Sequence, residues 1–482
     1  MNLFATKPLS LIQAESEGGQ HSLIRTLGAP SLVMLGIGAI IGAGLFSLTG
    51  IAAAENAGPA VVISFLVAAL GCAFAGLCYS EFATMIPIAG SAYTYAYATM
   101  GEFLAWIIGW DLVLEYAVGS ATVSISWSAY VVSFLHDLGI QLPAQLIASP
   151  WQPVKLADGS IVHGLINLPA VFIVVLISLL LMTGIRESAR VNAVIVVIKV
   201  AVVLVFIAVG FGYIKSSNYT PFIPENSGVF GEFGWSGIMR AAGVIFFAYI
   251  GFDAVSTAAQ EAKSPQRTMP IGIIGSLIIC TVLYVLFSVV LTGLVSYKEL
   301  KVAAPVALAI DQTPFMWLKP SIKLAIIAGF TSVILVMLLG QSRVFFSMSR
   351  DGLLPKVFSD IHPKFHTPWR SNLLFMVFVS LFSAFAPISV VGHMTSIGTL
   401  LAFVIVCAGI LVMRHTHPNT PRPFRTPWVP LVPILGILVC FSMMYSLGVE
   451  NWLRLFVWLG LGLIIYFAYS RHHSHLAKLP KG

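Results

Sequence analysis

Long apolar stretches recur along the whole of this 482-residue chain, and they restrict its fold more than any other feature. A segment that crosses the hydrocarbon core of a bilayer must satisfy its own backbone N–H and C=O groups, so repeated long apolar stretches predict membrane-spanning helices. Charged residues make up only 9% of the chain, against about 25% in an ordinary soluble domain. We therefore expect an all-α polytopic membrane protein.

Apolar runs of about 17 residues or more predict twelve spans. They are expected near residues 30–52, 58–86, 102–135, 167–184, 190–212, 235–259, 270–295, 322–348, 371–387, 391–413, 428–446 and 452–470. The third of these is long and rich in Ser and Thr, so it should lie centrally with its polar groups facing protein or water. No low-complexity run marks an appended soluble domain. We predict an N-terminal segment over 1–29, one transmembrane domain over 30–470 and a tail over 471–482.

Basic residues set the expected orientation of these spans. With both termini in the cytoplasm, the inside segments carry more than twice as many Lys and Arg residues as the outside loops, in agreement with the positive-inside rule. The net charge of +7 then reflects topology, so nucleic acid is not an expected partner. The first apolar run is too long for a cleavable signal peptide. We expect a multi-pass protein of the plasma membrane, in a bacterium the inner membrane, surrounded by the lipid bilayer.

The first apolar run contains GAIIGAGLF at residues 38–46, with glycines at positions 42 and 44 near its centre. Each glycine weakens a helix by roughly 1 kcal/mol relative to alanine. One explanation is close helix packing, because Gly38 and Gly42 have the G-x-x-x-G spacing. The other is that the helix is interrupted here, so that its backbone N–H and C=O groups bind a ligand.

The sixth span has a similar interruption, which favours the broken-helix explanation. Its aromatic stretch contains Ala248, Gly251 and Asp253 in the corresponding place. Two interrupted helices at equivalent positions of two inverted repeats are the best sequence indication of a binding site at the membrane midplane. The half-helix that begins near Gly42 presents N–H groups that suit a carboxylate. Free carbonyls near residues 247–250 suit an ammonium group, so the two breaks together match an amino acid.

At these residues the chain resembles the amino acid/polyamine/organocation transporter superfamily and, within it, the cationic amino acid transporter branch. The matching motifs are GIGAIIGAGLF (36–46), AGSAYTYAYATMGEFLAWIIGWDLVLEYAVG (89–119), FFAYIGFDAVSTAAQEAKSPQRTMPIGI (246–273) and GQSRVFFSMSRDGLLP (340–355). The resemblance implies a five-plus-five inverted repeat of the leucine-transporter type, over about 30–212 and 235–413, with two peripheral helices over 428–470. It also implies alternating-access transport of L-amino acids, in bacterial members often by proton symport.

The resemblance assigns a substrate site residue by residue. It places the carboxylate at the backbone N–H groups of Gly42, Ala43 and Gly44, and the amine at the carbonyl groups of Ile40, Phe247, Ala248 and Ile250. It makes Phe247 an aromatic lid and puts Met337 in the side-chain pocket. Because Met337 fills volume and offers no charge partner, we expect small or medium neutral substrates. The branch name leaves transport of arginine or lysine, and amino acid exchange, as alternatives.

Several ionisable residues lie within the predicted spans. Lys199 has apolar neighbours on both sides, and a charge there costs at least about 2.5 kcal/mol, so the side chain should face the bundle. It is either a structural tether or a titrating group. In proton-coupled relatives a lysine on helix 5 stands where sodium-coupled relatives hold their ion, between helices 1 and 8, so the resemblance makes Lys199 the expected proton-coupling group and favours protons over sodium. We expect Glu115 and Asp253 to act in coupling and gating, Asp111 to be a packing or cytoplasmic-side group, and Arg240 to lie at the interface.

Other protein classes fit the sequence less well. A membrane-embedded enzyme would need paired aspartates or a nucleophile with a base, but the chain has no Asp-Asp pair and its histidines cluster in loops and in the C-terminal tail. A channel would favour repeated pore elements over one pair of half-helix sites. The five cysteines lack disulfide or metal-ligand spacing, and Pro363 separates His362 from His366. We therefore expect no enzyme activity, metal or cofactor, with the proton gradient as the energy source.

Overall fold

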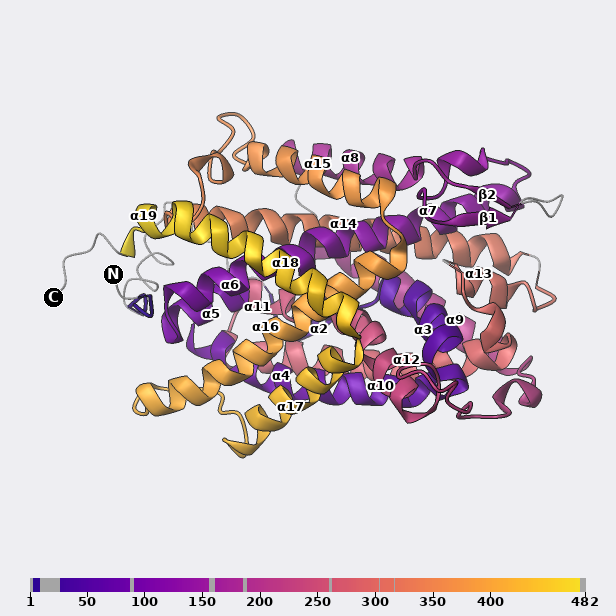
Figure 1. Cartoon of the computed structure of the whole chain (residues 1–482), viewed down its shortest axis with the longest axis horizontal. Coiled ribbons are helices and arrows are strands. Elements are labelled where there is room, and N and C mark those ends of the chain that lie inside the picture. The colour runs from indigo at the N-terminus through magenta and orange to yellow at the C-terminus, as the bar shows by residue number, and fades with distance from the viewer. Residues whose placement is uncertain are drawn as a thin grey trace.

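In the computed structural model of this protein, the described residues are 3–8, 27–86, 91–155, 161–184, 189–259, 262–302, 304–315 and 317–476. Its helices run mostly along one long axis (Figure 1). The N-terminal strap, residues 3–8, and the last described helix α19 (Arg471–His473) lie at one end of this bundle, which we call the termini end. A small antiparallel hairpin, β1 (Pro153–Lys155) with β2 (Ile161–His163), lies at the opposite end.

Helices account for most of the described chain. The longer ones are α2 (Ala29–Ile40), α4 (Val61–Met85), α6 (Glu102–Val113), α7 (Gly119–Asp137), α8 (Leu168–Met182), α9 (Ala189–Phe211), α10 (Gly234–Ile245), α12 (Pro265–Leu294), α14 (Leu318–Arg350), α15 (Trp369–Phe385), α16 (Ile388–Thr416), α17 (Leu431–Ser446) and α18 (Val449–Ile465). The short ones are α3 (Thr49–Ala52), α5 (Ser91–Thr99), α11 (Ala254–Thr257) and α13 (Pro305–Ile310). Single π-helical turns continue several helices, including Gly44–Leu48 before α3 and Leu114–Val118 between α6 and α7.

Eight helical segments among the described residues are long and apolar enough to cross a membrane. They are Gly44–Met85, Glu102–Asp137, Ala193–Phe211, Gly234–Ser256, Pro265–Leu294, Leu318–Arg350, Ile388–Thr416 and Val449–His473. Four shorter apolar helices, α2, α8, α15 and α17, accompany them. Each predicted apolar run therefore contains helical structure, but the first run is not one continuous helix, because α2 ends at Ile40 and helical structure resumes only at residue 43.

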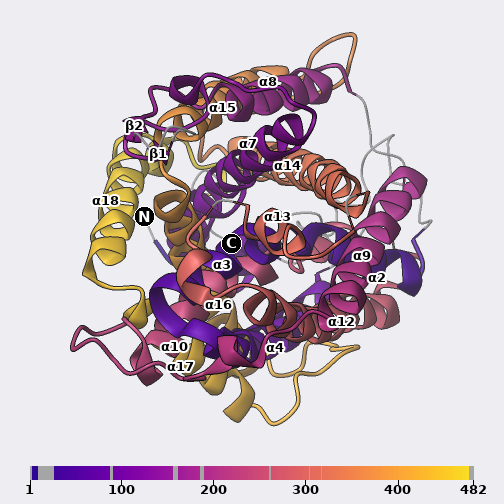
Figure 2. The same ribbon diagram turned by 90° about the vertical axis from the view of Figure 1, so that its right-hand side faces the viewer.

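Most of the long helices pack in two groups. On one side α12 packs along α4 and α2, and α10 along α4; on the other side α14 packs along α7, and α15 along α8. Figure 2, which looks at the hairpin end, shows α8, α15, α7 and α14 on one side and α4, α10, α12 and α17 on the other, with α3 and α16 between them. The helix breaks lie at the boundary of these two groups.

The polar third span is central, as predicted. Ser120, Thr122, Ser124, Ser126 and Ser128 are all fully buried. The first four of these hydroxyls donate to backbone carbonyls of the preceding turn of their own helix, and Ser128 donates to Asn167 at 2.6 Å. Such self-contained hydrogen bonds allow polar residues to lie in an apolar interior.

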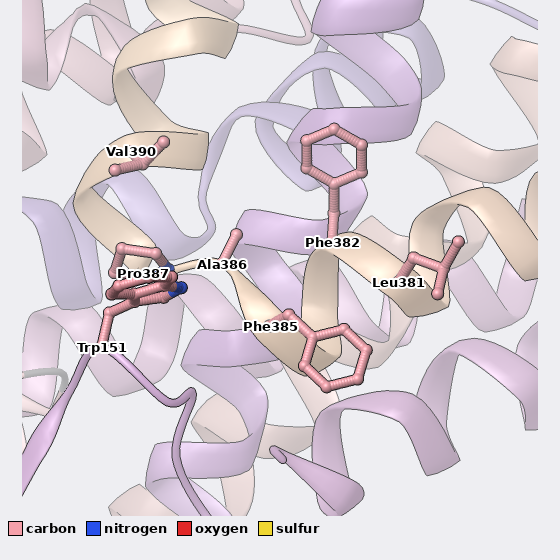
Figure 3. Close-up of a pocket in the computed structure, with 7 residues that line it drawn as sticks. All are labelled: Trp151, Leu381, Phe382, Phe385, Ala386, Pro387 and Val390. Carbon is pink, nitrogen blue, oxygen red and sulfur yellow. The ribbon is translucent and has the colours of Figure 1, made fainter. Parts of the chain in front are cut away.

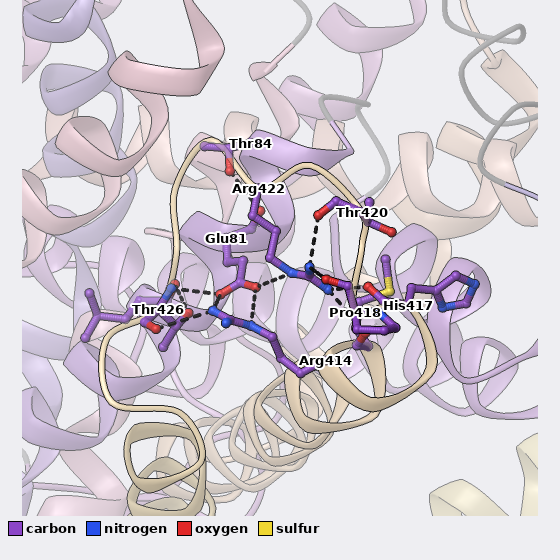
Figure 4. Close-up of polar contacts among 10 residues, drawn as sticks. Glu81, Thr84, Arg414, His417, Pro418, Thr420, Arg422 and Thr426 are labelled. Carbon is purple, nitrogen blue, oxygen red and sulfur yellow. Dashed lines mark hydrogen bonds and ion pairs between the residues drawn. The ribbon is translucent and has the colours of Figure 1, made fainter.

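A buried carboxylate fixes the connection between α16 and α17 at the termini end (Figure 4). Glu81 on α4 accepts two hydrogen bonds from the Arg414 guanidinium, both of 2.9 Å, and one of 2.8 Å from the backbone N–H of Thr426. Arg422 forms an ion pair with the same carboxylate at 3.2 Å and also donates to three backbone carbonyls of its own loop and to that of Met413 in α16. This loop is thereby anchored to α4.

Candidate substrate site at two helix breaks

The first helix break is formed by a change of backbone conformation at one residue. Ile41 takes an extended conformation, with ψ of 106°, directly after the last turn of α2. The next helical turn follows Gly42, whose carbonyl accepts from the N–H groups of Leu45 and Phe46, both at 3.2 Å. The first N–H groups of a helix have no acceptor within it. The N–H groups of residues 42–44 are thus available to an anion, at the positive end of the helix dipole.

The second break separates α10 from α11. Helix α10 continues as a 3₁₀ turn over Phe246–Tyr249 and ends at Ile250, which is extended with ψ of 135°. Gly251 has φ of +116°, a conformation that L-residues with a side chain rarely adopt;. A Cβ atom at Gly251 would also lie 2.9 Å from backbone atoms of Ala39 on α2. Glycine is needed here for both reasons.

The two breaks are in direct contact. A Cβ atom built at Gly44 would lie 2.2 Å from the Cα atom of Ala248, so only glycine permits this approach. The G-x-x-x-G explanation for Gly38 and Gly42 is wrong as stated, because α2 ends between them. Close approach does occur in the same motif, at Gly36 and Gly44: a Cβ atom at Gly36 would lie 2.5 Å from the Ser276 hydroxyl.

Tyr284 on α12 joins the two breaks, and it was not predicted from the sequence. Its hydroxyl lies 3.0 Å from the carbonyl oxygen of Ile40 and 2.8 Å from that of Ala248, in position to donate to either. These are two of the four carbonyls predicted to bind the substrate amine, so the structure brings them together. The third of these carbonyls, that of Phe247, accepts from the Ile250 N–H at 3.2 Å.

The predicted side-chain pocket lies along α14. Val333 is the nearest neighbour of a Cβ atom built at Gly42, at 3.4 Å, and Met337 follows one turn later. The Met337 sulfur lies 3.4 Å from the position of a Cβ atom at Gly119, and the methionine is 95% buried. Phe247 is likewise buried, at 3% exposed. Both predicted residues are therefore enclosed in the protein interior.

Lys199 lies beside the first break. Its ammonium group donates to the carbonyl of Gly38, on the last turn of α2, at 2.7 Å, and the side chain is 1% exposed. Its methylene groups run past Gly329 of α14, where a Cβ atom would lie 3.1 Å from Lys199 Cε. The lysine thus occupies the space between the first and eighth predicted spans, the region that the resemblance implied.

Three carboxyl groups are buried on the termini side of the breaks. Asp253, directly after the second break, accepts from Tyr116 at 2.8 Å and from Ser91 at 3.4 Å. The Glu115 carboxyl lies next to that of Asp253. Asp111 is one turn away on α6, and no described residue donates a hydrogen bond to either of its carboxylate oxygens.

The structure also places Arg240 and the five cysteines, which the sequence had drawn attention to. Arg240 on α10 donates to the carbonyls of Phe230 and Leu447, at 3.2 and 3.4 Å. All five cysteines are buried as free thiols. Among the described residues, no group of three or more His, Cys, Asp or Glu side chains could hold a metal ion.

A shallow apolar groove of about 460 Å³ lies away from the breaks, where α15 turns into α16. Figure 3 shows its lining, with Trp151 and Pro387 close together and Phe382, Phe385 and Leu381 farther along α15. It contains none of the predicted site residues. The contact between the two breaks therefore stays the candidate site.

The sequence matches the amino acid permease family over residues 27–465. The chain belongs to this family. The resemblance seen at the glycine motifs is thus confirmed, and the two breaks are those of an amino acid permease. The three relatives described next are each named as a permease or a transporter.

Three relatives illustrate the breadth of the family. The chain is 47% identical over 467 residues to the branched-chain amino acid permease BcaP of Bacillus subtilis, covering 97% of each protein. It is 44% identical over 477 residues to the methylthioribose transporter of the same organism, covering 99% of this chain and 100% of the relative. It is 36% identical over 418 residues to the vacuolar cationic amino acid transporter 4 of Arabidopsis thaliana, covering 87% and 68%.

Proposed function

We propose that this permease takes up neutral L-amino acids by proton-coupled symport, through alternating access to the site between the two breaks. The observation that carries the proposal is the contact of Gly44 with Ala248, which sets free N–H groups of one half-helix beside carbonyls of the other. An α-carboxylate and an α-ammonium group need these two sets of partners.

The proposed architecture has twelve spans in two inverted repeats, with the termini in the cytoplasm of a bacterial cell and the chain in its inner membrane. Helices at each predicted run and the family match support it. In this arrangement the first and second breaks are equivalent elements of the two repeats. The termini end is then the cytoplasmic end.

Substrate binding is assigned to backbone groups. Gly42, Ala43 and Gly44 hold the carboxylate, and the carbonyls of Ile40, Phe247, Ala248 and Ile250 hold the amine. Tyr284 acts as a positioning residue, because its hydroxyl keeps the Ile40 and Ala248 carbonyls on one side of the site. Phe247 closes over the bound substrate as a lid.

Selectivity is assigned to the wall that α14 forms. Met337 and Val333 are apolar, and Met337 packs toward Gly119, so a side chain of moderate size and no charge fits best. The relative from Bacillus subtilis that is named a branched-chain amino acid permease supports valine, leucine and isoleucine as the substrates within that class. Because one relative is named a methylthioribose transporter, methylthioribose is included among the substrates to be tested.

Proton coupling is assigned to Lys199, with Glu115 and Asp253 in gating. The ammonium group of Lys199 donates to a carbonyl of α2, so a movement of α2 during the cycle would change its hydrogen bonding. Weaker hydrogen bonding in a buried site favours the neutral form of a lysine. Binding and release of a proton would thereby follow the movement of the first half-helix.

The test is uptake into proteoliposomes of labelled alanine, valine, leucine, arginine, lysine and methylthioribose. Each is measured with an inward proton gradient, with a sodium gradient, and with internal substrate alone; an uncoupler and protein-free vesicles serve as controls. We expect proton-dependent accumulation of the neutral amino acids. Transport seen only with internal arginine or lysine would establish an exchanger, and accumulation of methylthioribose alone would overturn the amino acid assignment.

A further inference from the structure

Three basic side chains come together where α10 and α16 meet the turn between α17 and α18. Arg240 lies on α10 and Arg454 on α18. His393, on the second turn of α16, lies near the charges of both arginines. The loop between α16 and α17 is at the termini end, so the turn that follows α17 lies toward the hairpin end. We call Arg240, His393 and Arg454 the basic cluster.

Hydrogen bonds link the two arginines through the end of α17. The carbonyl of Leu447 accepts from the Arg240 guanidinium at 3.4 Å and from the side-chain amide of Asn451 at 2.8 Å. The side-chain carbonyl of Asn451 in turn accepts from Arg454 at 2.6 Å. A Cβ atom built at Gly448 would collide with the Arg240 guanidinium. Both guanidinium groups therefore lie beside the same turn.

The basic cluster has little negative charge to balance it. Among the described residues, no carboxylate forms an ion pair with Arg240, whose acceptors are the neutral carbonyls of Phe230 and Leu447. Arg454 forms an ion pair of 3.7 Å with Glu450, but the Glu450 side chain is 87% exposed, so this pair contributes little. Guanidinium groups form strong hydrogen bonds with phosphate. The cluster therefore has the chemistry of a phosphate site.

The depth of the cluster indicates which phosphate can reach it. Fewer than two turns of α10 separate Arg240 from the second break, which is about 9 Å of helix. Half of the hydrocarbon core is about 15 Å thick, and arginine side chains extend from within it to the interface. Large apolar side chains on α17 and α18 are at least half exposed near the cluster: Phe441, Tyr445, Leu453 and Phe456. This surroundings suits a lipid.

We propose that the basic cluster binds the phosphodiester group of an anionic phospholipid, such as phosphatidylglycerol, in the leaflet at the hairpin end. The two guanidinium groups donate to the phosphate oxygens, and the acyl chains lie along the apolar faces of α17 and α18. The positive-inside rule favours arginine at the opposite end, so topology does not account for Arg240 and Arg454. The bound lipid joins α10, which leads into the second break, to the peripheral helices. The inference needs only a bilayer around the chain, so it depends on neither the proposed substrate nor the coupling ion.

The test measures lipid binding to the purified full-length protein in mild detergent by native mass spectrometry. Phosphatidylglycerol is compared with phosphatidylcholine, which has no net charge. Arg240→Gln/Arg454→Gln removes both guanidinium groups, and Arg240→Lys/Arg454→Lys keeps their charge. Lys298→Gln/Lys301→Gln is the matched control, because it removes two positive charges from exposed side chains outside the cluster.

We expect the unmodified protein to prefer phosphatidylglycerol, and the double Gln variant at the arginines to bind it about tenfold more weakly. The lysine variant should fall in between, because an ammonium group keeps the charge but loses the bidentate geometry. The control pair should change the affinity by less than about twofold. An unchanged affinity in the double Gln variant at the arginines would overturn the site. An equal loss in the control pair would also overturn it, because bulk charge would then attract the lipid.

Two further measurements use the unmodified protein, so they do not depend on the folding of a variant. A photoactivatable phosphatidylglycerol should crosslink to the turn between α17 and α18, and crosslinks confined to other helices would exclude the basic cluster. Inorganic phosphate at millimolar concentration should not displace the lipid. Binding of inorganic phosphate without any preference for phosphatidylglycerol would make the ligand a soluble phosphate and overturn the lipid assignment.

Discussion

The two helix breaks and the termini end both join distant parts of the chain, but they use different chemical groups. At the breaks, backbone atoms meet through small residues, as at Gly44 against Ala248. At the termini end, charged and hydroxyl side chains meet, as at Lys7, Tyr93 and Asp351. A contact between backbone atoms cannot be removed by substitution, but an added side chain disrupts it. A contact between side chains can be removed by substituting either residue.

This difference predicts which substitutions should damage each region. Added atoms should damage the breaks, and removed polar groups should damage the contacts around them. The following changes separate the two cases, from the largest expected effect to the smallest.

Gly44→Val should abolish measurable substrate binding. A Cβ atom there would lie 2.2 Å from Ala248 Cα, and overpacking of this kind costs roughly 1–3 kcal/mol or more, enough to force the two breaks apart. Binding by isothermal calorimetry on purified protein measures the effect. Gly460→Val in α18 is the matched control, because a Cβ atom there would meet nothing within 4 Å. Normal binding in Gly44→Val would exclude this contact as the substrate site.

Lys199→Ala should abolish accumulation driven by the proton gradient while leaving part of the substrate binding. The ammonium group that Gly38 holds is removed, but the backbone groups at residues 42–44 remain. Uptake and binding are measured on the same preparation. Lys323→Gln is the control, since Lys323 is as deeply buried but pairs with Asp137 at the hairpin end. Gradient-driven uptake that survives in Lys199→Ala would reduce Lys199 to a structural tether.

The sequence predicted the breaks well because glycine reports directly on backbone conformation. Gly44 and Gly251 stand where an added Cβ atom would collide, and Gly251 also has a positive φ. The family match then confirmed what the glycine motifs implied. Boundaries were less accurate: the first run contains a break after Ile40, and the predicted span 58–86 is helix α4 from residue 61.

Tyr284 and the strap could not be predicted in the same way. Tyr284 is one tyrosine in an apolar span, and only the folded structure puts its hydroxyl beside two carbonyls from other helices. Lys7 and Asp351 are 344 residues apart, so no local pattern links them. The positive-inside rule accounts for such a lysine by topology alone.

Tyr284→Phe should weaken substrate affinity by about fivefold, because a net hydrogen bond contributes about 1 kcal/mol. The ring stays, and the Ile40 and Ala248 carbonyls lose the hydroxyl between them. Competition binding with a labelled substrate measures the change. Tyr249→Phe is the control, since its ring is 5.3 Å from that of Tyr284 but its hydroxyl donates to Phe65. A tighter affinity in Tyr284→Phe would mean that the hydroxyl competes with the amine.

Gly101→Ala should have the smallest effect, and only on the termini end. Gly101 has φ of +97°, and a Cβ atom there would lie 2.6 Å from the backbone of Phe4 in the strap. The strap must shift, so the midpoint temperature of thermal unfolding should fall by roughly 1–3 °C while substrate affinity stays within about twofold. Gly139→Ala adds the same methyl group at φ of +79° with nothing within 4 Å, and it should lower the midpoint by less, because it adds backbone strain alone. If both variants unfold alike, backbone strain and not contact with the strap accounts for the loss, and the contrast between the crowded breaks and the termini end fails.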